Sequence, residues 1–129
     1  MSESGTIANE HLAVAGSGAI ACGLASTAAH HGPVLLLARS TRSVDRARAT
    51  VEKTLERLGT EVDPAHVQIV TDIDALAPAT FVVEAVLENH EVKAGVLADL
   101  DAILAPQAIL ASTTSSLSIE RLAKASGRA

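Results

Sequence analysis

Two glycines and an alanine with a spacing suited to phosphate binding follow the first apolar segment of the chain. Residues 11–15 form a short apolar run that predicts a buried strand, and Gly16, Gly18 and Ala21 follow it in the pattern G-x-G-x-x-A. Gly16 would permit a tight turn, Gly18 would let a pyrophosphate approach the backbone, and the next helix would attract its charge. The candidate contacts are Gly16, Ser17, Gly18, Ala19, Ile20 and Ala21. The alternative interpretation is a strand-to-helix turn without a ligand.

A second candidate site follows the second apolar run, residues 34–38. In a dinucleotide-binding domain, an acidic residue about 20 residues beyond the glycines receives the ribose hydroxyls of NAD. This chain has Ala38 there, followed by Arg39, Ser40 and, two residues on, Arg42. No carboxylate would repel a 2′-phosphate here, and the guanidinium groups of Arg39 and Arg42 and the hydroxyls of Ser40 and Thr41 are near to bind it. The segment therefore predicts a preference for NADP(H) over NAD(H). The alternatives are a solvated arginine pair on a domain that takes NAD, and an arginine that stacks on adenine.

Apolar runs alternate with amphipathic segments along the chain. The pattern predicts strands over residues 11–15, 34–38, 67–70, 81–86 and 108–111, and helices over residues 19–31, 43–58 and 89–104 and from Ser118. This alternation predicts an α/β fold of the Rossmann type, with a doubly wound, mainly parallel sheet in a three-layer αβα arrangement. Ligands of such sheets bind beyond the carboxyl ends of the strands, so the loops after Ala15, Ala38, Val86 and Ala111 are the expected functional positions.

The composition limits the class of protein. The chain has 129 residues, 48% hydrophobic and 19% charged, which suits one globular domain. Ten basic residues against 15 acidic ones give a net charge of −5, so the chain lacks a basic field for nucleic acid or an anionic membrane. No apolar run approaches the roughly 18 residues of a membrane span. We expect a flexible N-terminus over residues 1–10 and a single domain over residues 11–129.

Cysteine and histidine usage adds two expectations. The lone Cys22 cannot form an internal disulfide, which favours a reducing cytoplasm, and its neighbours in a small-residue helix favour a packing role. No metal site is predicted. The histidines are expected in structural or solvent-exposed roles; they are His11, His30, His31, His66 and His90.

Three stretches resemble the N-terminal NAD(P)-binding domain of the 3-hydroxyacyl-CoA dehydrogenases. They are residues 16–25, residues 82–89 together with Lys93, and residues 109–119, and the resemblance extends from Leu12 to about Ala125. Enzymes of that family oxidise the 3-hydroxyl group of an acyl-CoA by hydride transfer to a nicotinamide cofactor, or run the reverse reduction. The resemblance therefore implies an oxidoreductase of fatty acid metabolism that acts on an acyl-CoA or a related acyl-carrier substrate.

The resemblance also implies roles for single residues. Ala85 would contact the cofactor, and Glu88 and Lys93 would contact it near the nicotinamide ribose. Ser115 would bind both that ribose region and the substrate oxygen, which makes it the candidate for orienting the substrate; the alternative is a serine that caps a local turn. Thr54 matches a hydroxyl position near bound CoA.

One acid needs its own explanation, because Glu84 lies within an apolar strand. A buried carboxylate requires partners, and Glu84 is interpreted as a structural residue that accepts backbone N–H groups.

The chain departs from the family pattern at several positions. Ala21 replaces the third glycine, Ala38 replaces the ribose-binding acid, and Thr113 replaces the asparagine before T-S-S. The segment after Leu58 lacks the expected basic residues, which leaves open another acyl carrier or a smaller hydroxy acid.

The family's catalytic histidine and its glutamate partner would lie beyond Ala129, as would the helical C-terminal domain through which family members dimerise. The chain by itself is therefore expected to bind cofactor without catalysing the reaction. The alternative is a stand-alone NADP(H)-binding or regulatory module that acts through a partner.

Overall fold

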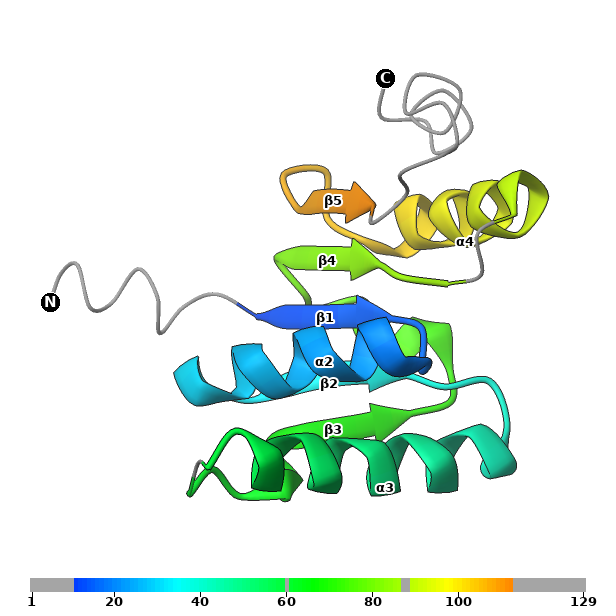
Figure 1. Ribbon diagram of the computed structural model, residues 1–129. Helices are drawn as coiled ribbons and strands as arrows, with labels where there is room; N and C mark the ends of the chain where they lie inside the picture. The colour runs from blue at the N-terminus through cyan, green and yellow to red at the C-terminus, as the bar shows by residue number, and fades with distance from the viewer. Residues whose placement is uncertain (1–10, 60, 87–88, 113–129) are drawn as a thin grey trace, which may run out of the picture.

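The computed structural model describes residues 11–59, 61–86 and 89–112, in which strands alternate with helices (Figure 1). The strands are β1 (Leu12–Ala15), β2 (Val34–Leu37), β3 (Val67–Val70), β4 (Phe81–Glu84) and β5 (Ile109–Ser112). The α-helices are α2 (Ala19–Ala28), α3 (Thr41–Arg57) and α4 (His90–Ile103), and the 3₁₀ helices are η1 (Ala29–His31), η2 (Pro64–His66) and η3 (Ile73–Leu76).

The five strands form one parallel sheet in the order β3-β2-β1-β4-β5, and their arrows all point the same way in Figure 1. The chain runs outward from β1 to β2 and β3, then returns to the other side of β1 for β4 and β5. The carboxyl ends of β1 and β4 therefore flank the point where the connections diverge. Ala15 lies there, opposite Leu37 of β2 and Glu84 of β4. The predicted doubly wound fold is confirmed.

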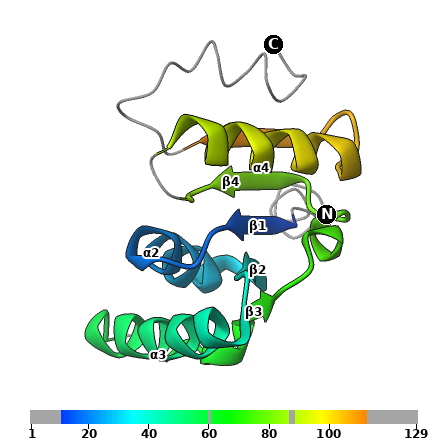
Figure 2. The same ribbon diagram turned by 90° about the vertical axis from the view of Figure 1, so that its right-hand side faces the viewer.

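Alternating side chains of β1 divide the core between the two faces of the sheet. Val14 packs in one cluster with buried residues of α2 and α3, whereas Ala13 and Ala15 pack in another with Leu100 and other residues of α4. Helices α2 and α3 are neighbours, and α4 lies apart from them (Figure 2). Helices therefore cover both faces of the sheet, which is the predicted three-layer αβα arrangement.

Local hydrogen bonds explain two differences from the predicted boundaries. Helix α3 begins two residues earlier than predicted because Ser40 caps it, its Oγ accepting from Ser43 N at 3.1 Å. Strand β4 ends at Glu84 rather than Val86, since the Glu84 carboxylate accepts a hydrogen bond from Val86 N at 2.8 Å.

Two further segments complete the comparison with the predicted elements. The 3₁₀ turn η2 was not predicted and begins after Asp63, whose carboxylate accepts from Ala65 N at 2.9 Å. The helical segment predicted from Ser118 lies outside the described residues.

Within the described ranges, none of the helices has the length and apolar character that crossing a membrane requires.

Candidate cofactor-binding site

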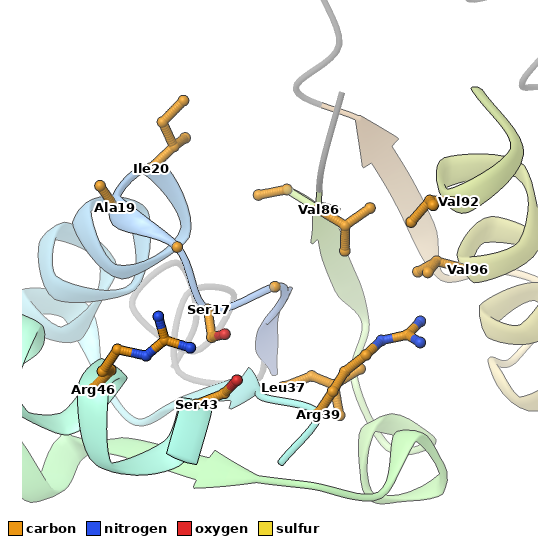
Figure 3. A pocket seen from close by; sticks show the side chains of 13 residues that line it. Ser17, Ala19, Ile20, Leu37, Arg39, Ser43, Arg46, Val86, Val92 and Val96 are labelled. Atoms are coloured by element: carbon orange, nitrogen blue, oxygen red, sulfur yellow. The ribbon is translucent and has the colours of Figure 1, made fainter. Parts of the chain in front are cut away.

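A pocket of about 770 Å³ opens beyond the carboxyl ends of β1, β2 and β4 (Figure 3). The loop after β1, the start of α2, the first two turns of α3, the loop after β4 and one face of α4 contribute to it. Its lining residues are Gly16, Ser17, Gly18, Ala19, Ile20, Leu37, Arg39, Ser43, Arg46, Ala85, Val86, Val92 and Val96. The position is the one at which doubly wound sheets bind their ligands.

Gly16 lies at the base of the pocket, where the ends of β1 and β2 meet the loop after β4. Its φ of +138° is a conformation that residues with a side chain rarely adopt, and a Cβ there would lie 2.5 Å from the carbonyl oxygen of Ala85. Its N–H donates to Leu37 O at 3.1 Å, while Ala85 N donates to Ala15 O at 2.8 Å. The predicted tight turn is therefore confirmed, with a glycine that both its φ and the neighbouring β4 loop require.

Gly18 differs from Gly16, because the surrounding protein does not require a glycine there. It caps α2 with an ordinary φ of −77°, and a Cβ would meet no atom within 4 Å. No side chain caps this helix, and the first intrahelical bond runs from Cys22 N to Gly18 O at 2.9 Å. The amides of the first turn thus have no intrahelical acceptor and can receive an anion, so the turn fits a pyrophosphate.

Small buried residues hold α2 close to the sheet and to α3. Ala21 and Cys22 are fully buried, and the Cys22 thiol contacts the backbone oxygens of Ser17 and Ala47 at 3.4 and 3.9 Å. Burial raises the pKa of the Cys22 thiol, which fits the expected packing role. Gly23 lies in the same helix but is half-buried, and a Cβ there would meet no atom within 4 Å, so packing does not require a glycine at this position.

The end of β2 brings one predicted arginine to the pocket and leaves the other out. Ala38 is fully buried and donates its N–H to Val70 O at 2.8 Å, so no carboxylate occupies the ribose-binding position. Arg39 is exposed and lines the pocket. Ser40 serves as the cap of α3, and neither Ser40 nor Arg42 belongs to the pocket lining.

Helix α3 contributes two side chains that sequence reasoning missed, Ser43 and Arg46. They are three residues apart and therefore share one side of a helix. The buried positions Ala47 and Val51 were a usable signal, since they orient α3 against the rest of the domain. In Figure 3 the guanidinium group of Arg46 and the hydroxyl of Ser43 point toward Ser17.

A buried ion pair lies beside the pocket. Glu84 Oε2 accepts hydrogen bonds from Lys93 Nζ at 2.7 Å and from Val86 N at 2.8 Å, and Oε1 accepts one from Ser112 Oγ. Both charged side chains are fully buried. Each donor helps to offset the cost of removing the carboxylate from water. The expectation that Glu84 accepts a backbone N–H is confirmed.

The remaining predicted contacts are distributed as follows. Ala85 lines the pocket, whereas Lys93 is buried on Glu84 and does not line it. Thr54 lies two turns beyond Arg46 on α3 and donates its hydroxyl to Thr50 O at 2.8 Å, away from the pocket lining. Glu88 and Ser115 lie outside the described residues.

Histidines do not assemble with other ligands in the described part of the chain. His11, His30, His31 and His66 are all exposed, and no group of three or more His, Cys, Asp or Glu side chains among the described residues could hold a metal ion.

Comparison with known proteins agrees with this geometry. The family model described as "3-hydroxyacyl-CoA dehydrogenase, NAD binding domain" matches residues 11–129. A probable 3-hydroxybutyryl-CoA dehydrogenase of Deinococcus radiodurans is 35% identical over 89% of this chain and 45% of its own length. The 3-hydroxyadipyl-CoA dehydrogenase of Escherichia coli is 38% identical over 87% of this chain and 26% of its own length.

Solved structures give the same result. FadB2 of M. tuberculosis superposes with a TM-score of 0.85 and 30% identity, over 92% of this chain and 46% of the other. (S)-3-Hydroxybutyryl-CoA dehydrogenase PaaH1 from Ralstonia eutropha superposes with a TM-score of 0.83 and 32% identity, over the same shares. The chain thus spans less than half the length of these relatives. It belongs to the family of NAD-binding domains of the 3-hydroxyacyl-CoA dehydrogenases.

Proposed function

We propose that this chain is the cofactor-binding part of an oxidoreductase that interconverts 3-hydroxyacyl and 3-ketoacyl thioesters. The observation that carries the proposal is the turn from Gly16 to Gly18, which lies at the switch point of the sheet and at the uncapped N-terminus of α2. Because a side chain at Gly18 would meet only open space, a glycine there suits a ligand's approach rather than internal packing. Relatives named as dehydrogenases of 3-hydroxybutyryl-CoA and 3-hydroxyadipyl-CoA support an acyl-CoA substrate.

The bound nicotinamide cofactor would supply the redox chemistry, accepting a hydride from the hydroxyl-bearing carbon or returning it to the ketone. This chain's own residues would bind and orient it. The amides at the start of α2 would hold the pyrophosphate, and Ala85 and Val86 would border the site from the β4 side. Ser115 would orient the substrate oxygen, with Glu88 at the nicotinamide ribose, whereas Lys93 would act indirectly through its ion pair with Glu84 beside the pocket.

Catalysis would require groups that we do not assign to this chain. Removal of the hydroxyl proton during oxidation needs a base, and none of the histidines lies in the context of the family's catalytic residue. We therefore infer that the chain alone binds cofactor without turnover. We further propose that the complete enzyme is a cytoplasmic homodimer, with Thr54 near the CoA moiety.

The cofactor preference is a separate part of the proposal. Ala38 occupies the position at which NAD-binding domains present an acid, and the pocket lining contains two arginines and no Asp or Glu. A phosphomonoester on the adenosine ribose would meet attraction there without carboxylate repulsion. We propose that the site prefers NADP(H) to NAD(H).

Calorimetric titration of NADPH and NADH into the purified chain tests both parts. We expect NADPH to bind at least about tenfold more tightly, which corresponds to roughly 1.4 kcal/mol. The variant Arg39→Asp places a carboxylate near the ribose hydroxyls and should reduce or reverse this preference. Failure of both nucleotides to bind would contradict the cofactor function, whereas equal binding of both would contradict the NADP(H) preference alone.

A turnover assay tests the catalytic part. We expect no formation of reduced nicotinamide from 3-hydroxybutyryl-CoA and NADP⁺ or NAD⁺ in the presence of the chain alone. Sustained turnover would show that the chain contains a base that the assignment has overlooked.

A further inference from the structure

The two arginines of the pocket occupy different parts of it. In Figure 3 the Arg46 guanidinium points toward Ser17 and the glycine turn, whereas the Arg39 guanidinium extends in the other direction, toward Val92 and Val96. Ser43 lies between them and presents its hydroxyl toward Ser17. The pocket thus has a polar corner, formed by Ser17, Ser43 and Arg46, and an apolar side that Arg39 borders.

The polar corner has a fixed backbone. Ser40 caps α3, and Val44 N donates to Ser40 O at 2.9 Å, so the helix is regular from its first turn. Ala47, directly after Arg46, is fully buried, and its carbonyl oxygen lies 3.9 Å from Cys22 Sγ in α2. Helix α3 is therefore held against α2, and Arg46 is held at the edge that faces the glycine turn.

Arg42 lies one turn before Arg46 on the same side of the same helix. The two arginines are four positions apart, which at about 100° per residue is roughly 40° around the helix axis, so they differ mainly in their position along that axis. The Arg42 side chain is exposed and does not line the pocket. Arg42 and Arg46 thus carry the same charge one turn apart, with only Arg46 at the site.

The donors of the polar corner are available to a ligand. Ser40 Oγ donates to Ser43 Oγ at 3.0 Å, which leaves the proton of the Ser43 hydroxyl to be donated elsewhere. Within the described ranges, Arg46 forms no ion pair, and no Asp or Glu lines the pocket. A planar guanidinium beside two hydroxyls is suited to the oxygens of a phosphomonoester.

The other side of the pocket has different chemistry. Val86, Val92 and Val96 provide an apolar wall, and Arg39 provides a planar cation beside it. An aromatic heterocycle such as adenine can pack against the valines and stack under a guanidinium group.

From this division we infer that Ser17, Ser43 and Arg46 bind the 2′-phosphate of NADP(H), that Arg39 stacks on the adenine, and that Arg42 contacts neither. The inference rests on the proposed cofactor function and assigns its selectivity to α3. Because the whole chain carries a net charge of −5, this local cation must overcome an unfavourable overall charge to attract the phosphate.

The test compares Arg46→Ala with its matched control Arg42→Ala, which removes the same charge from the same exposed helix one turn away. Calorimetry measures the affinities of NADPH and NADH for the wild-type chain and for each variant. We expect Arg46→Ala to weaken NADPH binding by about 10- to 100-fold, as loss of a charge-assisted hydrogen bond does, and to change NADH binding by less than about threefold. Arg42→Ala should change neither affinity by more than about threefold.

The variant Arg39→Ala tests the adenine contact, and a series of salt concentrations tests the charge interaction with the 2′-phosphate. Arg39→Ala should weaken NADPH and NADH by the same factor, because both cofactors contain adenine. Raising the salt concentration should weaken NADPH binding more steeply than NADH binding in the wild type, and Arg46→Ala should remove this difference. Melting curves by circular dichroism confirm that each variant is folded.

The outcomes separate this inference from the proposed function. If the wild type prefers NADPH and Arg46→Ala keeps that preference, or if Arg42→Ala removes it, the assignment to Arg46 is wrong and the cofactor function stands. If Arg46→Ala weakens both cofactors equally, Arg46 binds the pyrophosphate and the inference is overturned. If the wild type binds neither cofactor, the proposed function itself fails.

Discussion

Glu84 at the end of β4 and Lys93 in α4 form an ion pair without solvent exposure, with 2.7 Å between Lys93 Nζ and Glu84 Oε2. Ser112 of β5 donates to the other carboxylate oxygen, so one side chain joins two strands and a helix. The same carboxylate binds Val86 N, and Val86 lines the pocket. The ion pair therefore connects the core of the domain to one wall of the cofactor site.

Breaking this pair should destabilise the domain strongly. Lys93→Met leaves the Glu84 carboxylate buried without its cation, and we expect a loss of about 3–5 kcal/mol in the free energy of unfolding. Glu84→Gln combined with Lys93→Met should cost less than the sum of the two single changes, because neither charge is then left unpaired. Urea unfolding followed by circular dichroism measures the double-mutant cycle. Additive effects would show that the two side chains do not stabilise each other.

The two glycines of the β1–α2 turn should respond differently to the same substitution. Gly16→Ala combines an unfavourable positive φ with a Cβ 2.5 Å from Ala85 O, and we expect a loss of more than about 2 kcal/mol in the free energy of unfolding. Gly18→Ala meets no atom of the protein, so thermal stability should be unchanged or slightly raised.

The Gly18→Ala variant also tests whether the cofactor binds at this turn. Gly18→Ala should weaken NADPH and NADH alike, because the added methyl group would stand where the pyrophosphate approaches the turn. Calorimetry of the folded variant measures the effect. Unchanged affinity would mean that the pyrophosphate binds elsewhere, and a large loss of stability would contradict the geometry of the turn.

The buried thiol predicts a dependence of stability on alkaline pH. Burial raises the pKa of Cys22 above its ordinary value, so the thiol stays neutral in the folded chain while it ionises in the unfolded chain above about pH 8.5. The unfolded state then binds fewer protons than the folded state, and the free energy of unfolding should fall as the pH rises through that range. Cys22→Ala should unfold with a shallower pH dependence. Equal slopes for the two proteins between pH 8 and 10, roughly the range of thiol ionisation, would refute this account.

Much of the fold follows from local patterns that can be recognised in the sequence. The apolar runs of β1 and β2 are buried on both faces, and the helical period of α3 is marked by Ala47, Val51 and Leu55, so their element types depend mainly on near neighbours. The turn at Gly16 is similarly local, since a G-x-G pattern between a strand and a helix has few other solutions. The alternation of these elements was sufficient to predict a parallel, doubly wound sheet.

The composition of the site depended on contacts between elements distant in the sequence. Arg42 and Arg46 are equivalent as residue types and share one side of α3, and the position of α3 along its axis relative to α2 decides which of them lines the pocket. Lys93 matches a cofactor contact by resemblance, yet the pairing of β4 with β5 brings Ser112 to Glu84 and completes a buried cluster around the lysine. Local sequence determined the elements and the phosphate turn, because those depend on backbone preferences and periodicity. Tertiary packing determined which side chains share the pocket and which share the core, because that depends on register and on the rotation of each helix against its neighbours.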